Sequence, residues 1–181
     1  MGAWIVFADE SGFLLIPSVC RTWAPRGQTP YLKHRYRHDR LSVHSAIAVS
    51  PVRQRLRLFY RWQDTNIRAA DAADFIRQVL CHLRGTVFVI WDNASIHRGT
   101  TFVAFIKRHP RLHLIPLPAY APELNPDEGV WQASKRRLAN SFPNDLSALG
   151  VALEEALESI AHSPTALRAC ITQSDLPPFL R

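Results

Sequence analysis

Cysteine is scarce in this chain of 181 residues, and no two cysteines have the CxxC spacing. Cys20, Cys81 and Cys170 lie far apart, so the sequence predicts neither a disulfide framework nor a zinc site built on cysteine. Reduced, partly buried thiols are the simplest expectation. Low-complexity tracts are also missing and 47% of the residues are apolar, which argues against a disordered chain.

Long apolar runs are missing as well. No stretch approaches the roughly 20 apolar residues that cross a bilayer. Residues 1–7 also lack the basic start and the apolar segment of a secretory signal. We therefore expect a soluble intracellular protein, and the length suits one well-packed core better than two.

Acidic residues are the minority, because 15 Asp and Glu accompany 22 Lys and Arg, for a formal net charge of +7. Such a surplus favours a polyanionic partner, since each phosphate that the protein neutralises releases condensed counterions. Two basic runs are candidates for DNA contact, although each could also be a solvated surface. The first comprises Lys33, Arg35, Tyr36, Arg37 and Arg40, and the second Lys135, Arg136 and Arg137.

The spacing of apolar residues predicts strands first, then strands and helices in alternation. This order indicates an α/β layer fold with a mixed sheet and a single domain, with a core over about 4–140 and a helical extension over about 145–181. The expected strands are 4–8, 13–16 after a Ser-Gly turn, 41–49, 56–62, 86–91 and 112–117. The expected helices are 69–83, 100–108, one starting near 126, and one following Asn144-Asp145.

Three acidic residues stand at the ends of these elements. Asp9 and Asp92 close buried strands, and Glu128 lies in the first turn of a helix. Carboxylates at the ends of neighbouring strands converge, and their mutual repulsion without a metal indicates a bound cation. Taken singly, each residue has an ordinary explanation as a turn, cap or helix-dipole residue.

Two of these acids have acidic neighbours. Successive strand residues point to opposite faces, so only one of Asp9 and Glu10 can join the cluster. We favour Asp9, which shares its face with Phe7, and expect Glu10 to be a salt-bridge or solvent residue. Asp127 suits a helix N-terminus, where the dipole favours an anion, whereas Glu128 shares its side with Trp131.

At this point the residues resemble a known family. Three segments are similar to the active-site blocks of DDE transposases: residues 7–12 (FADESG), 91–97 (WDNASIH) and 120–131 (YAPELNPDEGVW). The third block is the most specific of the three. The 35 residues between Asp92 and Glu128 also match the bacterial insertion-sequence branch related to mariner elements. The resemblance places the chain in the superfamily that includes retroviral integrases and ribonuclease H.

The resemblance implies a ribonuclease H-like fold, with a mixed five-stranded sheet flanked by helices. It also implies that Asp9, Asp92 and Glu128 are the catalytic residues and hold two Mg²⁺ or Mn²⁺ ions. The implied reaction is hydrolysis of a phosphodiester at the transposon end, followed by attack of the freed 3′-hydroxyl on target DNA, commonly at a TA dinucleotide. Asn93 and His97, in the second block, would support the metal ligands or contact DNA.

Two features depart from the family. Its members carry helix-turn-helix domains before the catalytic domain, whereas this chain begins just before the first acid. We therefore expect a catalytic fragment, the second half of a split reading frame, or a repurposed copy. Asp127 stands where the family has an uncharged residue, and it would either alter metal binding or face solvent.

The function expected from the sequence is DNA cleavage and strand transfer by a transposase catalytic domain. We expect a homodimer on double-stranded DNA, a possible separate DNA-binding polypeptide, and a cytoplasmic, nucleoid-associated location in a bacterium. Two alternatives stay open: another nuclease of the same fold, acting on RNA–DNA hybrids or junctions, and a non-catalytic DNA-binding protein that retains the fold.

Overall fold

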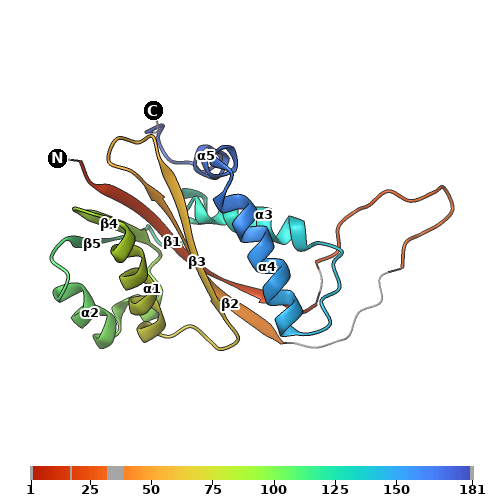
Figure 1. The fold of residues 1–181 in the computed structure, drawn as a ribbon, viewed down its shortest axis with the longest axis horizontal. Coiled ribbons are helices and arrows are strands. Elements are labelled where there is room, and N and C mark those ends of the chain that lie inside the picture. Colours follow the sequence, from red (N-terminus) through yellow and green to blue (C-terminus); the bar gives the residue numbers. More distant parts are fainter. Residues whose placement is uncertain (1, 17, 32–38, 180–181) are drawn as a thin grey trace.

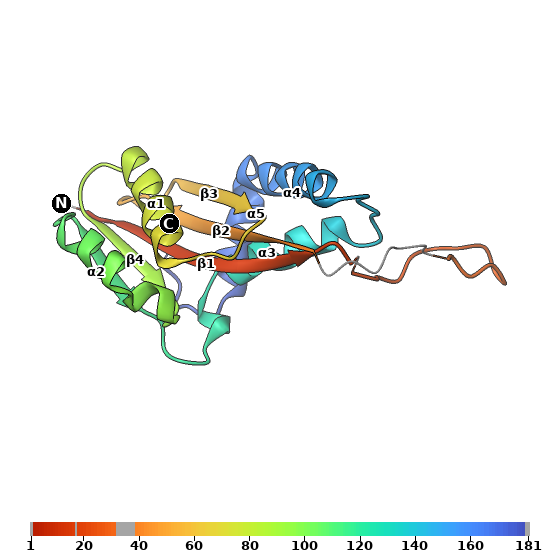
Figure 2. The ribbon, with the colours of Figure 1, turned by 90° about the horizontal axis from the view of Figure 1, so that it is seen from below.

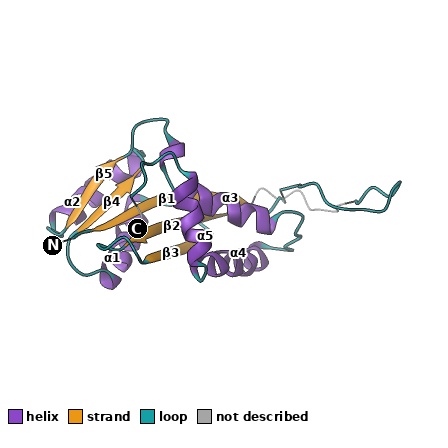
Figure 3. Cartoon of the chain, turned by 90° about the horizontal axis from the view of Figure 1, so that it is seen from above, coloured by secondary structure: helices purple, strands orange, loops and turns teal. Residues whose placement is uncertain are grey.

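A computed structural model describes residues 2–16, 18–31 and 39–179. Five strands form one mixed sheet in the order β3-β2-β1-β4-β5, with helices on both sides (Figures 1 and 3). The predicted α/β architecture is therefore confirmed. The strands are β1 (Trp4–Leu14), β2 (Arg40–Val49), β3 (Leu56–Gln63), β4 (Val87–Trp91) and β5 (Leu112–Pro116). The helices are α1 (Ala69–His82), α2 (Thr100–Lys107), α3 (Asp127–Leu138), α4 (Leu146–Ala161) and α5 (Pro164–Gln173), with 3-10 turns at Ser95–Arg98 and Pro122–Leu124.

The sheet has two buried faces, because side chains alternate along each strand. Val6 and Ala8 of β1 belong to a core formed with α1 and α2. Phe7 and Phe13 of the same strand belong to a second core, formed with α3, α4 and α5 on the opposite side (Figure 2). The side of β1 that carries Asp9 therefore faces α3, and the side that carries Glu10 faces α1 and α2.

The prediction of two short strands at the start of the chain is wrong. β1 is one continuous strand of 11 residues, and it runs through the expected Ser11-Gly12 turn. The reason is the antiparallel partner: the ladder with β2 continues from Ile5 opposite Val49 to Leu14 opposite Arg40. Pairing along the whole length satisfies the backbone groups of residues that, taken locally, favour a turn.

The last two helices, α4 and α5, each begin at a residue whose side chain caps the helix N-terminus. Asp145 caps α4 by accepting a hydrogen bond from the Ala148 amide at 2.8 Å, as its place before an apolar stripe predicts. α5 lies within the helical extension expected over about 145–181, but the sequence analysis assigns no separate helix there, although Ser163 caps α5 and Pro164 occupies its first turn, which is a typical helix start. No helix in the described part of the chain is long and apolar enough to span a membrane.

Residues 18–31, which belong to the connection between β1 and β2, project from the body of the molecule (Figures 1 and 2). Asn140, at the end of α3, holds the base of this connection through its backbone amide to Ser18 and its side chain to Cys20. Farther out, Trp23 is fully exposed. The projecting segment thus starts from a hydrogen-bonded anchor and carries an uncovered aromatic ring.

Gly150, in α4, allows the helix to pack closely against β3. A Cβ atom at Gly150 would lie 2.7 Å from Cη2 of Trp62, which is closer than atoms can approach. We expect Gly150→Ala to lower the free energy of unfolding by about 1–2 kcal/mol, because overpacking outweighs the gain in helix propensity. Urea unfolding measures the change.

Gly12→Ala is the matched control for this prediction, because a Cβ atom there meets nothing within 4 Å. Its free energy of unfolding should stay close to that of the unmodified protein. Equal stability of the Gly150→Ala and Gly12→Ala variants would show that α4 and β3 adjust without strain.

Candidate active site

Asp9, Asp92 and Glu128 line one cleft of about 440 Å³. Parallel pairing of β1 with β4, in which Phe7 lies opposite Ile90, brings the first two acids to the same end of the sheet. Asp92 directly follows β4, whereas Asp9 lies within β1 rather than at its end. Glu128 enters from the first turn of α3. The structure thus brings together the three carboxylates that the sequence separates by up to 119 positions.

Asp9 is the most buried of the three, with 9% of its surface exposed. The indole Nε1 of Trp131 donates a hydrogen bond to its Oδ2 atom at 2.9 Å. Burial raises the pKa of Asp9 from 3.8 to about 7; the Trp131 bond opposes the rise, and the charges of Glu10 and Glu128 add to it. A nearby cation would favour the ionised form of this buried carboxyl group and so lower its pKa again.

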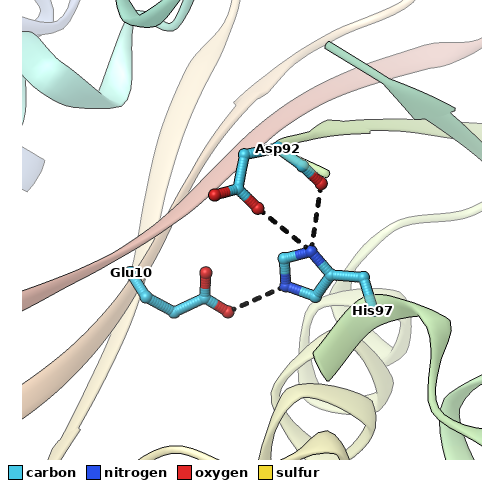
Figure 4. Close-up of side chains that lie close together, drawn as sticks. All are labelled: Glu10, Asp92 and His97. Carbon is cyan, nitrogen blue, oxygen red and sulfur yellow. Dashed lines mark hydrogen bonds and ion pairs between the residues drawn. The ribbon is translucent and has the colours of Figure 1, made fainter. Parts of the chain in front are cut away.

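Asp92 is held by His97, as Figure 4 shows. The Nδ1 atom of His97 lies 3.1 Å from Oδ1 of Asp92 and 3.1 Å from its backbone oxygen. This hydrogen bond is the main cause of a lowered pKa at Asp92. The imidazole is buried, and although burial alone would lower its pKa, the bonds to Asp92 and Glu10 raise it to about 9.

Glu10 completes this arrangement from the other side of the ring. Its Oε1 atom lies 3.1 Å from Nε2 of His97 and 3.5 Å from Nδ1 of His44, and its Oε2 accepts a bond from Trp91 at 3.1 Å. Burial raises the pKa of Glu10, but the contact with His44 and the bond from His97 outweigh it, so the pKa is lowered. The expectation of a salt-bridge role for Glu10 agrees with this geometry.

Among the described residues, one group of three side chains has ligand atoms close enough together to share a metal ion, and the three acids of the cleft do not form a second such group. Glu10, Asp92 and His97 place ligand atoms within 4.8 Å of one another. However, the imidazole stands between the two carboxylates and uses one nitrogen on each (Figure 4), which is a bridge rather than a cage around one ion. Asp9, Asp92 and Glu128 offer only oxygen atoms in an open cleft, the donor set that Mg²⁺ and Mn²⁺ prefer.

The expectation that Asp127 could face solvent is wrong, because its side chain is buried. It is fully buried, on the side of α3 that also carries Val130, Trp131 and Ser134. Its Oδ1 atom accepts a hydrogen bond from the Ser45 hydroxyl of β2. Burial raises the pKa of Asp127 well above its ordinary value, and the Ser45 bond opposes that rise.

Of the remaining residues singled out from the sequence, Asn93 lies at the cleft and Arg40 lies outside its lining. Asn93 lines the cleft, and its backbone oxygen accepts a bond from Arg98 at 3.0 Å. Arg40 is exposed at the start of β2 and bonds to Asn66. Lys33, Arg35, Tyr36 and Arg37 lie outside the described residues.

The second basic run occupies the exposed last turn of α3. The Lys135 ammonium lies 5.8 Å from the centre of the Phe13 ring, and Arg137 donates to the Ser159 hydroxyl at 2.7 Å. Arg136 is exposed as well. These three cations lie outside the cleft lining, so the structure does not bring them to the carboxylates.

Sequence reasoning missed three contributors to the site. Arg98 and Tyr120 line the cleft, and Tyr120 is fully exposed with a φ of 60°. Trp131 was expected only as a core residue, yet its indole N–H bonds to Asp9. The one available signal was the spacing of Trp131, which places it one helical turn after Glu128.

Solved structures of Mos1 transposase have the same fold. A paired-end complex of Mos1 transposase with the left transposon end matches with a TM-score of 0.60 and 16% identity, over 94% of this chain and 55% of that chain. The catalytic domain of Mos1 mariner transposase matches with a TM-score of 0.54 and 13% identity, over 96% and 84% of the two chains. These likenesses confirm the ribonuclease H-like, transposase-type fold that the sequence predicts.

Sequence comparison leads to the same group of proteins. The Tc1 transposase of Caenorhabditis elegans is 27% identical over 168 residues, which is 87% of this chain and 60% of the relative. The chain thus spans less than two thirds of the length of that transposase. Residues 4–149 match the sequence profile described as DDE superfamily endonuclease. Because this match covers most of the chain and includes all three acids of the cleft, the chain belongs to the DDE superfamily of endonucleases.

Proposed function

We propose that this chain is the catalytic domain of a DNA transposase, which cleaves DNA strands at transposon ends and transfers the 3′-hydroxyl to target DNA. The observation that carries the proposal is the convergence of Asp9, Asp92 and Glu128 on one cleft in a DDE endonuclease fold. Its relatives include the Tc1 transposase and the Mos1 complexes with transposon DNA.

The three carboxylates are proposed to hold two Mg²⁺ or Mn²⁺ ions, which supply Lewis acidity for in-line displacement at phosphorus. The protein orients two of these ligands by hydrogen bonds. Trp131 holds one oxygen of Asp9, and His97, itself held by Glu10, fixes the Asp92 carboxylate. Such outer contacts orient the ligands of a metal site.

DNA is the proposed substrate, and the chain carries the charge that this requires, with a formal net charge of +7. Arg98 and Asn93 line the cleft with Asp92, and we propose that they contact the cleaved strand. Lys135, Arg136 and Arg137, on the exposed end of α3, are proposed contacts to the backbone farther from the cut. The first basic run is proposed to serve in the same way.

We also propose the assembly that paired end cleavage requires. Two copies of the chain on two transposon ends would cut both ends, and a separate or preceding DNA-binding segment would recognise them. One of the structures with the same fold is a Mos1 transposase paired-end complex, which supports this arrangement. The bacterial insertion-sequence branch and a nucleoid-associated location stay predictions from the sequence.

The proposal is tested by incubating the chain with supercoiled plasmid and a labelled duplex that carries a free 3′-hydroxyl, in Mn²⁺, Mg²⁺ or EDTA. We expect open-circular plasmid and joined products with either metal, and none in EDTA, because three uncompensated carboxylates repel the phosphate.

Three other outcomes would contradict the proposed function. Nicking that persists in EDTA would contradict metal-dependent chemistry. Cleavage confined to RNA–DNA hybrids would identify another nuclease of the ribonuclease H type. Retarded DNA without nicking or joining, at every metal concentration, would indicate a non-catalytic DNA-binding protein.

A further inference from the structure

The buried carboxyl group of Asp127 lies next to the proposed metal ligand Glu128 in the sequence but does not line the cleft. Asp127 immediately precedes Glu128, and its surface is 0% exposed. Its Oδ1 atom accepts a hydrogen bond from the Ser45 hydroxyl, and Ser45 is also 0% exposed. Its Oδ2 atom has no hydrogen-bond partner among the described residues. A buried carboxyl group is unfavourable unless it is hydrogen-bonded, so the Ser45 contact must matter to this segment.

The position of Ser45 explains why the pair lies beside Asp9. In the antiparallel ladder between β1 and β2, Ser45 is directly opposite Asp9. Side chains of opposed residues project from the same face of a sheet, which here is the face covered by α3. The hydroxyl that holds Asp127 is therefore the cross-strand neighbour of a proposed metal ligand.

The start of α3 is attached to the sheet by two further hydrogen bonds. The side chain of Asn125 donates to the backbone oxygen of Ala8 at 3.3 Å, and Trp131 donates to Asp9 at 2.9 Å. Both of these contacts reach β1. The Ser45–Asp127 bond reaches β2, so the start of α3 is attached to two neighbouring strands of the sheet.

From this geometry we infer that Ser45 and Asp127 are a positioning pair that sets Glu128 against Asp9 and thereby determines the affinity of the site for divalent metal. The inference rests on the proposed function, because it assumes that these carboxylates bind the ions. In this arrangement the bond to β2 offsets the unfavourable burial of the Asp127 carboxyl group.

The test compares Mn²⁺ binding, measured by calorimetry, in the unmodified chain and in Ser45→Ala, Asp127→Asn and Ser134→Ala. Ser45→Ala leaves Asp127 buried without its donor, and we expect the Mn²⁺ affinity to fall about tenfold. Asp127→Asn keeps a carbonyl oxygen that accepts the Ser45 bond, so its affinity should stay within about twofold of the original. Urea unfolding of each variant separates this effect from a general loss of stability.

Ser134→Ala is the matched control. Ser134 lies on the same buried side of α3, at 0% exposure, and its hydroxyl has no hydrogen-bond partner in the described part of the chain. Its removal should leave Mn²⁺ affinity unchanged. A Ser45→Ala affinity equal to that of Ser134→Ala would overturn the inference, and so would a loss in Asp127→Asn as large as in Ser45→Ala.

The same experiment separates the inference from the proposed function. If the unmodified chain binds Mn²⁺ and Ser45→Ala weakens that binding, the positioning pair stands even where no strand is cut. If the unmodified chain binds no Mn²⁺, the pair positions no metal ligand and the inference is wrong. If Mn²⁺ binds equally in all four proteins and plasmid is nicked, the inference alone fails.

Discussion

Asp92→Ala is expected to lower the rate of metal-dependent DNA cleavage by at least about 10³-fold, because a metal-bound phosphoryl transfer depends on several kcal/mol of charge stabilisation. Asp92 is the half-exposed carboxylate of the cleft, and His97 holds it at 3.1 Å in a fixed orientation. Alanine removes a proposed metal ligand, while His97 keeps its bonds to Glu10 and to the backbone oxygen of residue 92. Plasmid nicking in Mn²⁺ measures the loss.

Two controls make this result specific. Glu155→Gln, in the exposed part of α4, alters a carboxyl group outside the cleft lining and should nick plasmid at the original rate. Non-specific DNA binding by Asp92→Ala should be retained, because the substitution makes the chain more positive. Cleavage that survives in Asp92→Ala would mean that the site has been wrongly assigned, whereas loss of both cleavage and DNA binding would indicate misfolding.

Asp9 should make the stability of the metal-free protein depend on pH. Its pKa in the folded chain is about 7, against 3.8 ordinarily, so between these values the folded state binds more protons than the unfolded state. Stability contributed by this group is present below pH 4 and is lost as the pH rises through 7. Because the difference is roughly three pKa units, the loss amounts to about 4 kcal/mol at most.

The Asp9→Asn variant isolates this contribution, since asparagine keeps an oxygen for the Trp131 bond but does not ionise. We expect the variant to gain stability relative to the original chain on going from pH 4 to pH 8, by up to about 4 kcal/mol. Urea unfolding in EDTA at both pH values measures the difference. A constant difference between the two proteins would show that Asp9 titrates normally.

The affinity for Mn²⁺ should rise with pH, whereas the stability of the metal-free protein falls with pH. A divalent ion binds the ionised form of Asp9, so Mn²⁺ affinity is expected to fall about tenfold for each pH unit below 7. Calorimetry at pH 5, 6 and 7 tests this slope. An affinity that does not change over this range would contradict a coordinated Asp9.

The elements that the sequence predicts well are those with strong local patterns. The run from Val87 to Trp91 is apolar throughout and forms β4, which is buried on one face and partly buried on the other, and Asp145 before an apolar stripe begins α4. The continuity of β1 and the separate start of α5 within the expected helical extension are not predicted. For β1, a turn-like local sequence was overridden by pairing with β2. For α5, the Ser163-Pro164 start was present but overlooked.

By itself, the sequence determined the fold class, the family and the three acids of the cleft, because hydrophobic periodicity and a specific motif are carried by residues close together in the chain. Only the tertiary structure decided what surrounds those acids. The bonds from Trp131 to Asp9, from His97 to Glu10 and from Ser45 to Asp127 join residues 122, 87 and 82 positions apart. Contacts of this kind depend on strand register and on how a helix docks, which no local pattern encodes, and they determine the burial and charge of each carboxyl group.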